Sequence, residues 1–97
     1  MTADPTGTRK TIERVGLGAW FQVNDDGTPT WVCCHAVLRG KIPATGQKVT
    51  ELRGATADGE LISFVDLDNS PIQALTKREA KAAGLVDPRT VAAGDAR

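Results

Sequence analysis

Cys33, Cys34 and His35 carry the most versatile chemistry in this sequence, and they stand side by side in the run Thr30–Arg39. They are the only two cysteines and the only histidine of the chain. Thiolate and imidazole groups bind zinc, and together they can also act as nucleophile and base. Because side chains alternate along an extended strand, Cys33 and His35 would share one face, and Cys34 would point to the other.

A metal-binding or catalytic role needs further groups that the sequence does not mark. A structural zinc ion takes four ligands, and no second pair of cysteines or histidines exists, so a carboxylate such as Asp25 would have to complete the site. A cysteine nucleophile also needs an oxyanion hole, and no motif indicates one. We therefore predict no metal, no cofactor and no enzymatic activity, with Cys34 as a small buried apolar residue and Cys33 as an ordinary surface cysteine.

The run Thr30–Arg39 is typical of a β-strand, because it is rich in valine, tryptophan and cysteine and lies between turn-forming residues. The preceding apolar segment, 17–23, predicts a hairpin partner. A register with Phe21 opposite Val32 gathers the apolar side chains on one face, whereas a shift by one residue would mix the two faces. The predicted core face then contains Leu17, Ala19, Phe21, Val23, Val32, Cys34, Ala36 and Leu38.

The opposite face of this hairpin is the surface that we expect to bind a partner. Trp20 and Trp31 are neighbours there in the same register. An exposed apolar patch that contains tryptophan commonly marks a protein-interaction surface. Alternatively, a C-terminal helix covers this face through Ala80, Ala83 and Leu85 and forms the rest of the core. The predicted partner-binding residues are Trp20, Trp31, Cys33, His35 and Val37.

Turn-forming residues divide the rest of the chain into short strands. The first strand either ends before Gly16 or continues with a bend at Gly16 and Gly18. The strand at 61–67 carries apolar residues on both faces, so we expect it to be central in the sheet. The expected strands outside the hairpin are 11–15, 49–55, 61–67 and 72–75.

The C-terminal part predicts one short helix and a tail. Thr76-Lys77-Arg78-Glu79 matches a capping box, and Gly84 lies where a left-handed C-cap residue would end a helix that runs to Ala83. We expect a single domain over 11–86, between a flexible tail at 1–10 and a loose tail at 87–97.

The charge balance argues against a strongly basic or membrane-bound protein. The 97 residues include 12 basic and 12 acidic side chains, so the net charge is zero. Binding to nucleic acid or to an anionic membrane normally requires a basic excess. No run reaches the ~18 apolar residues of a membrane-spanning helix, and the first residues lack the apolar core of a signal peptide. Two adjacent reduced cysteines fit a reducing compartment, so we expect a cytoplasmic protein.

These elements predict an α+β, mainly β domain: a curled antiparallel sheet or small barrel of four to six strands with one short C-terminal helix. A tryptophan-containing strand followed by Phe64-Val65-Asp66-Leu67-Asp68-Asn69 resembles the small SH3-like and Tudor-type barrels. The chain has no tyrosine, so the aromatic cage of a methyl-ligand reader is not carried over. In length, in its Ala/Arg/Gly/Thr-rich composition and in its polar tails, the chain also resembles short accessory proteins of phages that infect high-GC bacteria, which implies a context and no mechanism.

We predict a non-catalytic interaction module that binds itself, as a homodimer, or a host protein through the face that carries Trp20, Trp31 and His35. The alternative function is a nucleic-acid-associated accessory protein. In that case Lys77, Arg78 and Lys81 would contact phosphates, and a tryptophan would stack on a base.

Overall fold

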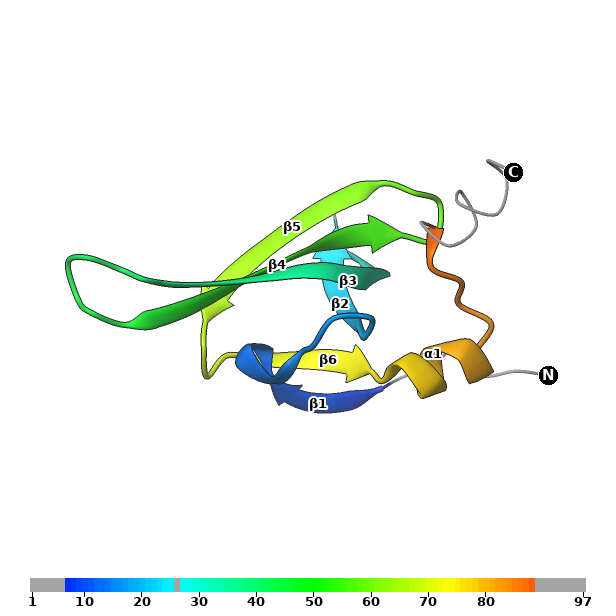
Figure 1. Cartoon of the computed structure of the whole chain (residues 1–97), viewed down its shortest axis with the longest axis horizontal. Helices are drawn as coiled ribbons and strands as arrows, with labels where there is room; N and C mark the ends of the chain where they lie inside the picture. The colour runs from blue at the N-terminus through cyan, green and yellow to red at the C-terminus, as the bar shows by residue number, and fades with distance from the viewer. Residues whose placement is uncertain (1–6, 26, 89–97) are drawn as a thin grey trace.

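The computed structural model describes residues 7–25 and 27–88, and within them the chain forms one curled sheet and one short α-helix (Figure 1). A 3-10 turn, η1, lies between the first two strands. The elements are β1 (Thr8–Thr11), η1 (Ile12–Arg14), β2 (Trp20–Asp25), β3 (Thr28–Lys41), β4 (Lys48–Thr56), β5 (Leu61–Leu67), β6 (Pro71–Leu75) and α1 (Lys77–Ala82).

The sheet is open, and this confirms the predicted mainly β class with a curled antiparallel sheet. Its strand order is β1-β6-β2-β3-β4-β5, and every neighbouring pair is antiparallel. Strands β2 to β5 follow each other along the chain, and β6 then returns to lie between β2 and β1. Figure 1 shows the resulting curl, with β1 and β6 below β4 and β5 and with β2 and β3 joining the two parts. Strands β1 and β5 are therefore the two edges.

The predicted hairpin register is confirmed. Phe21 pairs with Val32, and Trp20 pairs with Cys33. Phe21 and Val32 are fully buried in the larger core cluster. A register shifted by one residue would move such apolar side chains out of the core, which is why the alternation of apolar residues predicts this pairing. Leu17 is an exception, because it lies in the turn before β2 and is exposed, so its predicted place in the core is wrong. The buried members of this cluster are Ile12, Val15, Phe21, Val32, Cys34, Leu52, Ile72 and Ala74.

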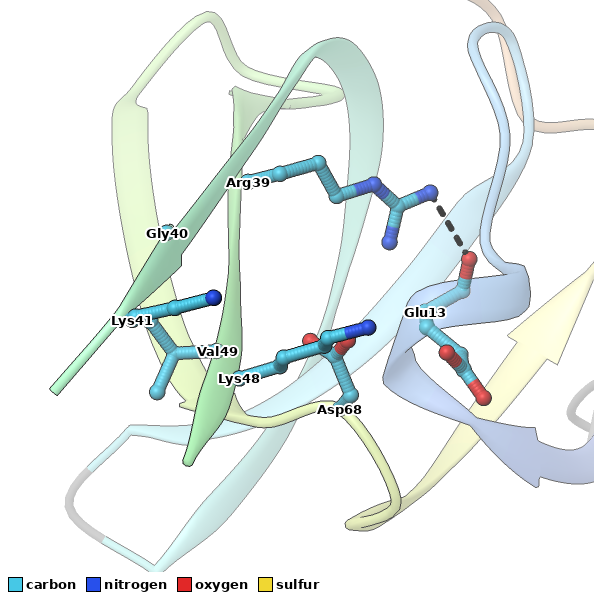
Figure 2. A pocket seen from close by; sticks show the side chains of 7 residues that line it. All are labelled: Glu13, Arg39, Gly40, Lys41, Lys48, Val49 and Asp68. Carbon is cyan, nitrogen blue, oxygen red and sulfur yellow. Dashed lines mark hydrogen bonds between the residues drawn. The ribbon is translucent and has the colours of Figure 1, made fainter. Parts of the chain in front are cut away.

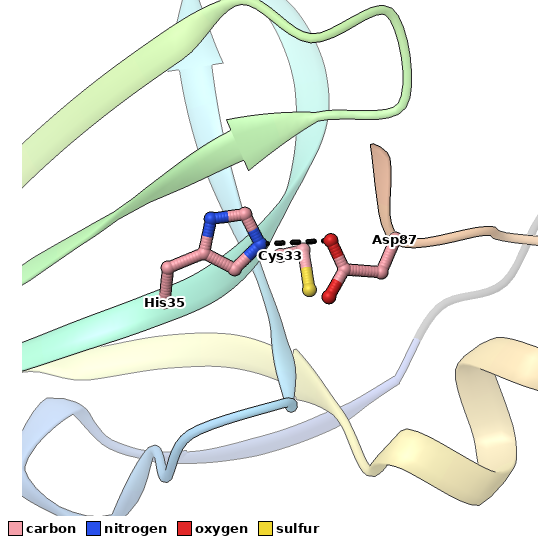
Figure 3. A group of neighbouring side chains, drawn as sticks. All are labelled: Cys33, His35 and Asp87. Carbon is pink, nitrogen blue, oxygen red and sulfur yellow. Dashed lines mark hydrogen bonds and ion pairs between the residues drawn. The ribbon is translucent and has the colours of Figure 1, made fainter. Parts of the chain in front are cut away.

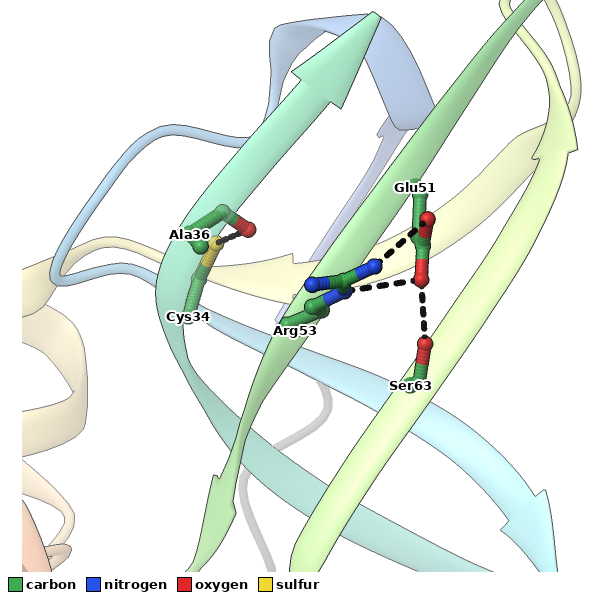
Figure 4. Close-up of polar contacts among 5 residues, drawn as sticks. All are labelled: Cys34, Ala36, Glu51, Arg53 and Ser63. Carbon is green, nitrogen blue, oxygen red and sulfur yellow. Dashed lines mark hydrogen bonds and ion pairs between the residues drawn. The ribbon is translucent and has the colours of Figure 1, made fainter.

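A β-bulge at His35 changes the faces of β3. Cys34 pairs with Gly54 and Ala36 pairs with Arg53, so the pairing skips His35. One extra residue exchanges inside and outside for everything that follows it. Beyond the bulge Val37 packs against the larger core cluster, with Cys34, so its predicted place on the face of Trp31 is wrong. Figure 4 shows the Cys34 thiol donating a hydrogen bond to the carbonyl of Ala36 within the bulge (3.6 Å).

The other consequence of the bulge concerns Leu38. It was predicted on the core face, but the exchange of faces leaves it exposed on the outside of the sheet.

The helix α1 begins and ends as its sequence predicts. The Thr76 hydroxyl accepts a hydrogen bond from the Glu79 amide, and the Glu79 carboxylate accepts one from the Thr76 amide, which makes a capping box. Gly84 has a φ of 85°, which favours glycine, and the amide of Leu85 donates to the carbonyl of Ala80 (2.9 Å). This tight C-terminal turn directs the chain back toward β3.

The helix closes a second, smaller core cluster. Trp20, Cys33, Leu75 and Ala80 are its buried members, and Trp31 and Leu85 pack against it. Trp20 is 3% exposed and Cys33 is 1% exposed. The sequence left open whether this face binds a partner or is covered by the C-terminal helix. At Trp20 and Cys33, the helix covers it.

Three predictions about the sheet differ from the structure. The predicted strand 11–15 is wrong for most of its length, because Ile12–Arg14 forms the 3-10 turn η1. β1 begins at Thr8, inside the segment expected to be a tail, and its hydrogen bonds go to β6, which is distant in the sequence. β5 is an edge strand and not a central one, because no strand of the described residues pairs with its outer side. Most of the two predicted tails, 1–6 and 89–97, lies outside the described residues.

Candidate functional site

Three side chains that can bind a metal or act in proton transfer meet beside the helix (Figure 3). Their ligand atoms, the Cys33 thiol, a His35 ring nitrogen and an Asp87 carboxylate oxygen, lie within 4.8 Å of one another. A hydrogen bond joins His35 Nε2 to Asp87 Oδ1 at 2.9 Å. A carboxylate only accepts, so Nε2–H is the donor in this hydrogen bond. We call these three residues the Cys-His-Asp cluster.

Two features of the fold bring the cluster together. In β3, His35 lies two residues after Cys33 and therefore on the same side of the strand, and the bulge leaves it out of the pairing with β4. The left-handed turn at Gly84 reverses the chain after α1, so that Asp87 returns to β3 across 52 residues of sequence. A longer α1 would carry Asp87 away from β3.

The cluster lines a hollow of about 520 Å³ between β3, α1 and the segment that follows α1. Cys33 is fully buried at the hollow, whereas the side chains of His35 and Asp87 are 12% and 28% exposed. Lys77 and Lys81, one helical turn apart, also line it. The remaining lining residues are Leu17, Gly18, Trp20, Cys34, Leu85 and Val86.

The directions of the three groups distinguish between two chemistries. In a nucleophile relay, the thiol faces one ring nitrogen and the carboxylate binds the other. Figure 3 shows the Cys33 thiol and the Asp87 carboxylate both on the Nε2 side of His35, while Nδ1 points away from them. The three donors thus converge on one point, which suits a shared cation better than a proton relay.

The structure separates the residues that were predicted to bind a partner. Trp20 and Cys33 are buried beneath α1, so the expected exposure of both is wrong. Trp31 and Val37 are partly buried and pack against the smaller and the larger core cluster, respectively. Two residues of this set, Cys33 and His35, belong to the Cys-His-Asp cluster. Of these two, only His35 has a side chain that reaches the surface.

The three basic residues of the alternative function, Lys77, Arg78 and Lys81, are all exposed on α1. Only Lys77 and Lys81 line the hollow, because Arg78 lies on another side of the helix. The predicted basic stripe therefore has two members beside the cluster and one away from it.

A second hollow, of about 490 Å³, lies where η1 meets the β3–β4 hairpin (Figure 2). Arg39 donates to the carbonyl of Glu13 (3.0 Å) and to the Thr50 hydroxyl (2.9 Å). That hydroxyl in turn donates to Asp68 (2.7 Å). Lys41 and Lys48 stand beside them, so the hollow mixes both charge signs. These contacts hold η1 against the hairpin and explain the arrangement without a ligand.

The outer face of β4 and β5 has a polar network of its own. Arg53 and the Ser63 hydroxyl both donate hydrogen bonds to the Glu51 carboxylate, at 2.9 and 2.6 Å (Figure 4). The hydrogen bond from Arg53, followed by that from Ser63, lowers the pKa of Glu51. This network belongs to the surface beside the β5 edge.

Asp87 is the site residue that the sequence analysis missed. It was placed in the loose C-terminal tail, and the Asp87-Pro88 pair was interpreted only as the end of the domain. The signal was the predicted C-cap at Gly84, which turns the chain back over the sheet, but no local pattern says which side chain a returning segment will meet.

Comparisons with known protein families, with curated proteins and with solved structures find no match. Among the described residues, no helix has the length and apolar character that crossing a membrane requires.

Proposed function

We propose that the protein is a non-catalytic interaction module that pairs with a second copy of itself through the outer edge of β5. The observation that supports this proposal is the exposure of apolar side chains on a strand that is paired on one side and open on the other. Leu61 is 84% exposed and Val65 is 58% exposed, and β5 has no strand on its outer side among the described residues. Exposed apolar edges of this kind are templates for pairing with another chain.

The two edges of the sheet differ in their protection. Soluble proteins commonly protect an edge by keeping it short or by placing lysine and other charges on it. β1 follows this rule, because it has four residues and carries Arg9 and Lys10. β5 has seven residues, and Asp66 is its only charged side chain. The contrast supports a role for β5 in pairing that β1 does not have.

The backbone of β5 has groups available for another strand. The amide of Asp68 donates to Lys48 in β4 (3.0 Å). Antiparallel pairing alternates between bonded and non-bonded positions, so the amides of Ser63 and Val65 point to the outer side. The amide of Leu67 is already bonded to the Asp66 carboxylate (2.8 Å). The outward groups of the middle of β5 are therefore the ones that a second strand would meet.

A second copy fits this edge because β5 is compatible with itself. Antiparallel pairing about a two-fold axis at Phe64 places Ser63 opposite Val65 and Asp66 opposite Ile62, so that no two charges face each other within the strand. Each copy has only one edge of this type, so a two-fold pair closes and leaves no further β5 edge.

The mass in solution tests this proposal. We expect light scattering after gel filtration under reducing conditions to give twice the monomer mass, in a concentration-dependent equilibrium. Val65→Pro removes an outward amide and no bond to β4, and Val65→Lys adds a charge to the edge, so each should give a monomer. Circular dichroism would check that both variants are folded.

The matched control is Leu38→Lys, which replaces another exposed apolar residue on the outer face, two strands from the edge. It should leave the dimer intact. A wild-type protein that is monomeric at every concentration would overturn the proposal, as would a dimer that survives both Val65 variants.

Binding to nucleic acid, a cytoplasmic location and a phage-type context stay predictions. A titration with labelled DNA and RNA at low salt tests the first of these, and the Lys77→Ala/Lys81→Ala variant should lose any salt-dependent binding.

A further inference from the structure

We propose that the Cys-His-Asp cluster binds a borderline divalent cation of the zinc class. Cys33, His35 and Asp87 would supply the three protein ligands, and the fourth position would face the hollow beside α1. Three protein ligands plus one exchangeable position is an established arrangement for zinc. This proposal is independent of the β5 edge.

The identity of the donor atoms selects the class of ion. One sulfur, one imidazole nitrogen and one carboxylate oxygen suit zinc and its transition-metal neighbours. Magnesium and calcium prefer sites made of oxygen alone, so the Cys33 thiol argues against them. The three ligand atoms lie within 4.8 Å of one another, so they can surround one ion but not two.

The directions of the groups give the position of the ion. The thiol and the carboxylate lie on the Nε2 side of His35 (Figure 3), and Nε2 and Oδ1 are 2.9 Å apart. Two ligand atoms at tetrahedral positions with bonds of about 2.0–2.1 Å are separated by about 3.3 Å. Hence the pair needs to open by only a few tenths of an ångström, and the ion takes the place of the proton that Nε2 now donates.

The protonation changes on binding are balanced. A neutral His35 ring loses its Nε2 proton to solvent and takes one up on Nδ1, so that the Nε2 lone pair can bind the ion. The Cys33 thiol releases its proton to solvent. The thiolate and the Asp87 carboxylate then carry two negative charges against the two positive charges of the ion. A buried thiolate without such a partner would pay a large desolvation cost.

Among residues 7–25 and 27–88, these three side chains are the ones that come together as possible ligands, so an exogenous group would complete the set. Cys34 points into the larger core cluster, on the other side of β3. The chain has no third cysteine and no second histidine. The fourth position is therefore open to water or to an anion, and the exposed Lys77 and Lys81 at the hollow favour the anion.

Zinc titration of the metal-free, reduced protein tests the proposal. We expect one ion per chain by calorimetry, an increase in Tm on zinc addition, and no effect of magnesium. Cobalt in place of zinc should give the near-ultraviolet charge-transfer absorption of a thiolate ligand, which reports the Cys33–metal bond directly.

Paired variants distinguish this site from adventitious binding. Cys33→Ala and Cys34→Ala each remove one buried sulfur, but only Cys33→Ala should abolish the cobalt–thiolate absorption. Asp87→Asn replaces a partly buried carboxylate with an amide of the same shape that can still accept the hydrogen bond from His35, and it should weaken zinc binding about 100-fold or more, since even outer-shell changes cost 10–100-fold.

A wild-type Kd weaker than about 0.1 mM would overturn the proposal. So would unchanged binding in Asp87→Asn, or an equal loss in the two cysteine variants. Zinc binding should also be measured for Val65→Lys. This variant should bind zinc with the wild-type affinity even if it is monomeric, so the test of the zinc site does not depend on the proposed dimer.

Discussion

His35 Nε2 lies 2.9 Å from Asp87 Oδ1, and this hydrogen bond joins a bulge in the middle of β3 to the segment that follows α1. The two residues are 52 positions apart in the sequence. The contact ties the returning segment to β3, and Leu85 of the same segment packs against the smaller core cluster.

The first prediction concerns the strength of this contact. Asp87→Ala and His35→Gln should each destabilise the metal-free protein, and a double-mutant cycle should give a coupling of about 0.5–1.5 kcal/mol, the usual net value of one hydrogen bond. Urea denaturation in the presence of a chelator measures it. Additive effects of the two substitutions would mean that the hydrogen bond does not form in solution.

The second prediction concerns the helix cap. Thr76→Ala removes the hydroxyl that accepts from the Glu79 amide, which should cost about 1 kcal/mol. Because α1 covers Trp20, fraying of the helix should also move the tryptophan emission to longer wavelength. Arg78→Ala, an exposed position in the same helix, is the control and should change neither quantity. An equal loss in both variants would contradict a specific role for the cap.

Local sequence patterns predicted the parts of this fold that depend on local physics. Alternating apolar residues fix the pairing of Phe21 with Val32, because the wrong register would expose the core. The capping box at Thr76 and the left-handed Gly84 depend on neighbouring backbone groups and are present as predicted.

The differences arise where distant segments meet. The bulge at His35 adds one residue to β3 without a glycine or proline to mark it, and it moves Val37 from the predicted outer face to the core. β5 looked central because both of its faces are apolar, yet it lies at an edge. Asp87 joins the candidate site only through tertiary packing, which no spacing in the sequence reveals.

The third prediction concerns high pH. Burial in the core raises the pKa of the Cys34 thiol above its ordinary value of 9.0. Above that pH the unfolded chain loses the proton while the folded chain keeps it, so the free energy of unfolding falls as pH rises, by at most about 1.4 kcal/mol per pH unit. Below that pH this contribution to stability is fully present.

Denaturation of the wild type and of Cys34→Ala between neutral and alkaline pH measures this effect. The variant has a lower stability at neutral pH because of the lost side-chain volume, but its stability should decline less steeply above the ordinary thiol pKa. Parallel curves for the two proteins would contradict the prediction.

The fourth prediction concerns Gly54, which pairs with Cys34 across the β3–β4 ladder. A Cβ atom added at Gly54 would overlap the carbonyl oxygen of Cys33, which is backbone and cannot move aside cheaply. Gly54→Ala should therefore force β4 away from β3, the strand that carries Cys33 and His35, and destabilise the protein by about 1–3 kcal/mol or more.

Gly40→Ala is the matched control, because a Cβ there would meet only the Val49 side chain at an ordinary contact distance of 3.5 Å. It lies on the same β3–β4 ladder and should change the free energy of unfolding by less than about 0.5 kcal/mol. Since Cys33 supplies the buried ligand of the proposed site, Gly54→Ala should also weaken zinc binding, whereas Gly40→Ala should not. A stable Gly54→Ala variant would mean that the two strands are farther apart in solution than the fold described above requires.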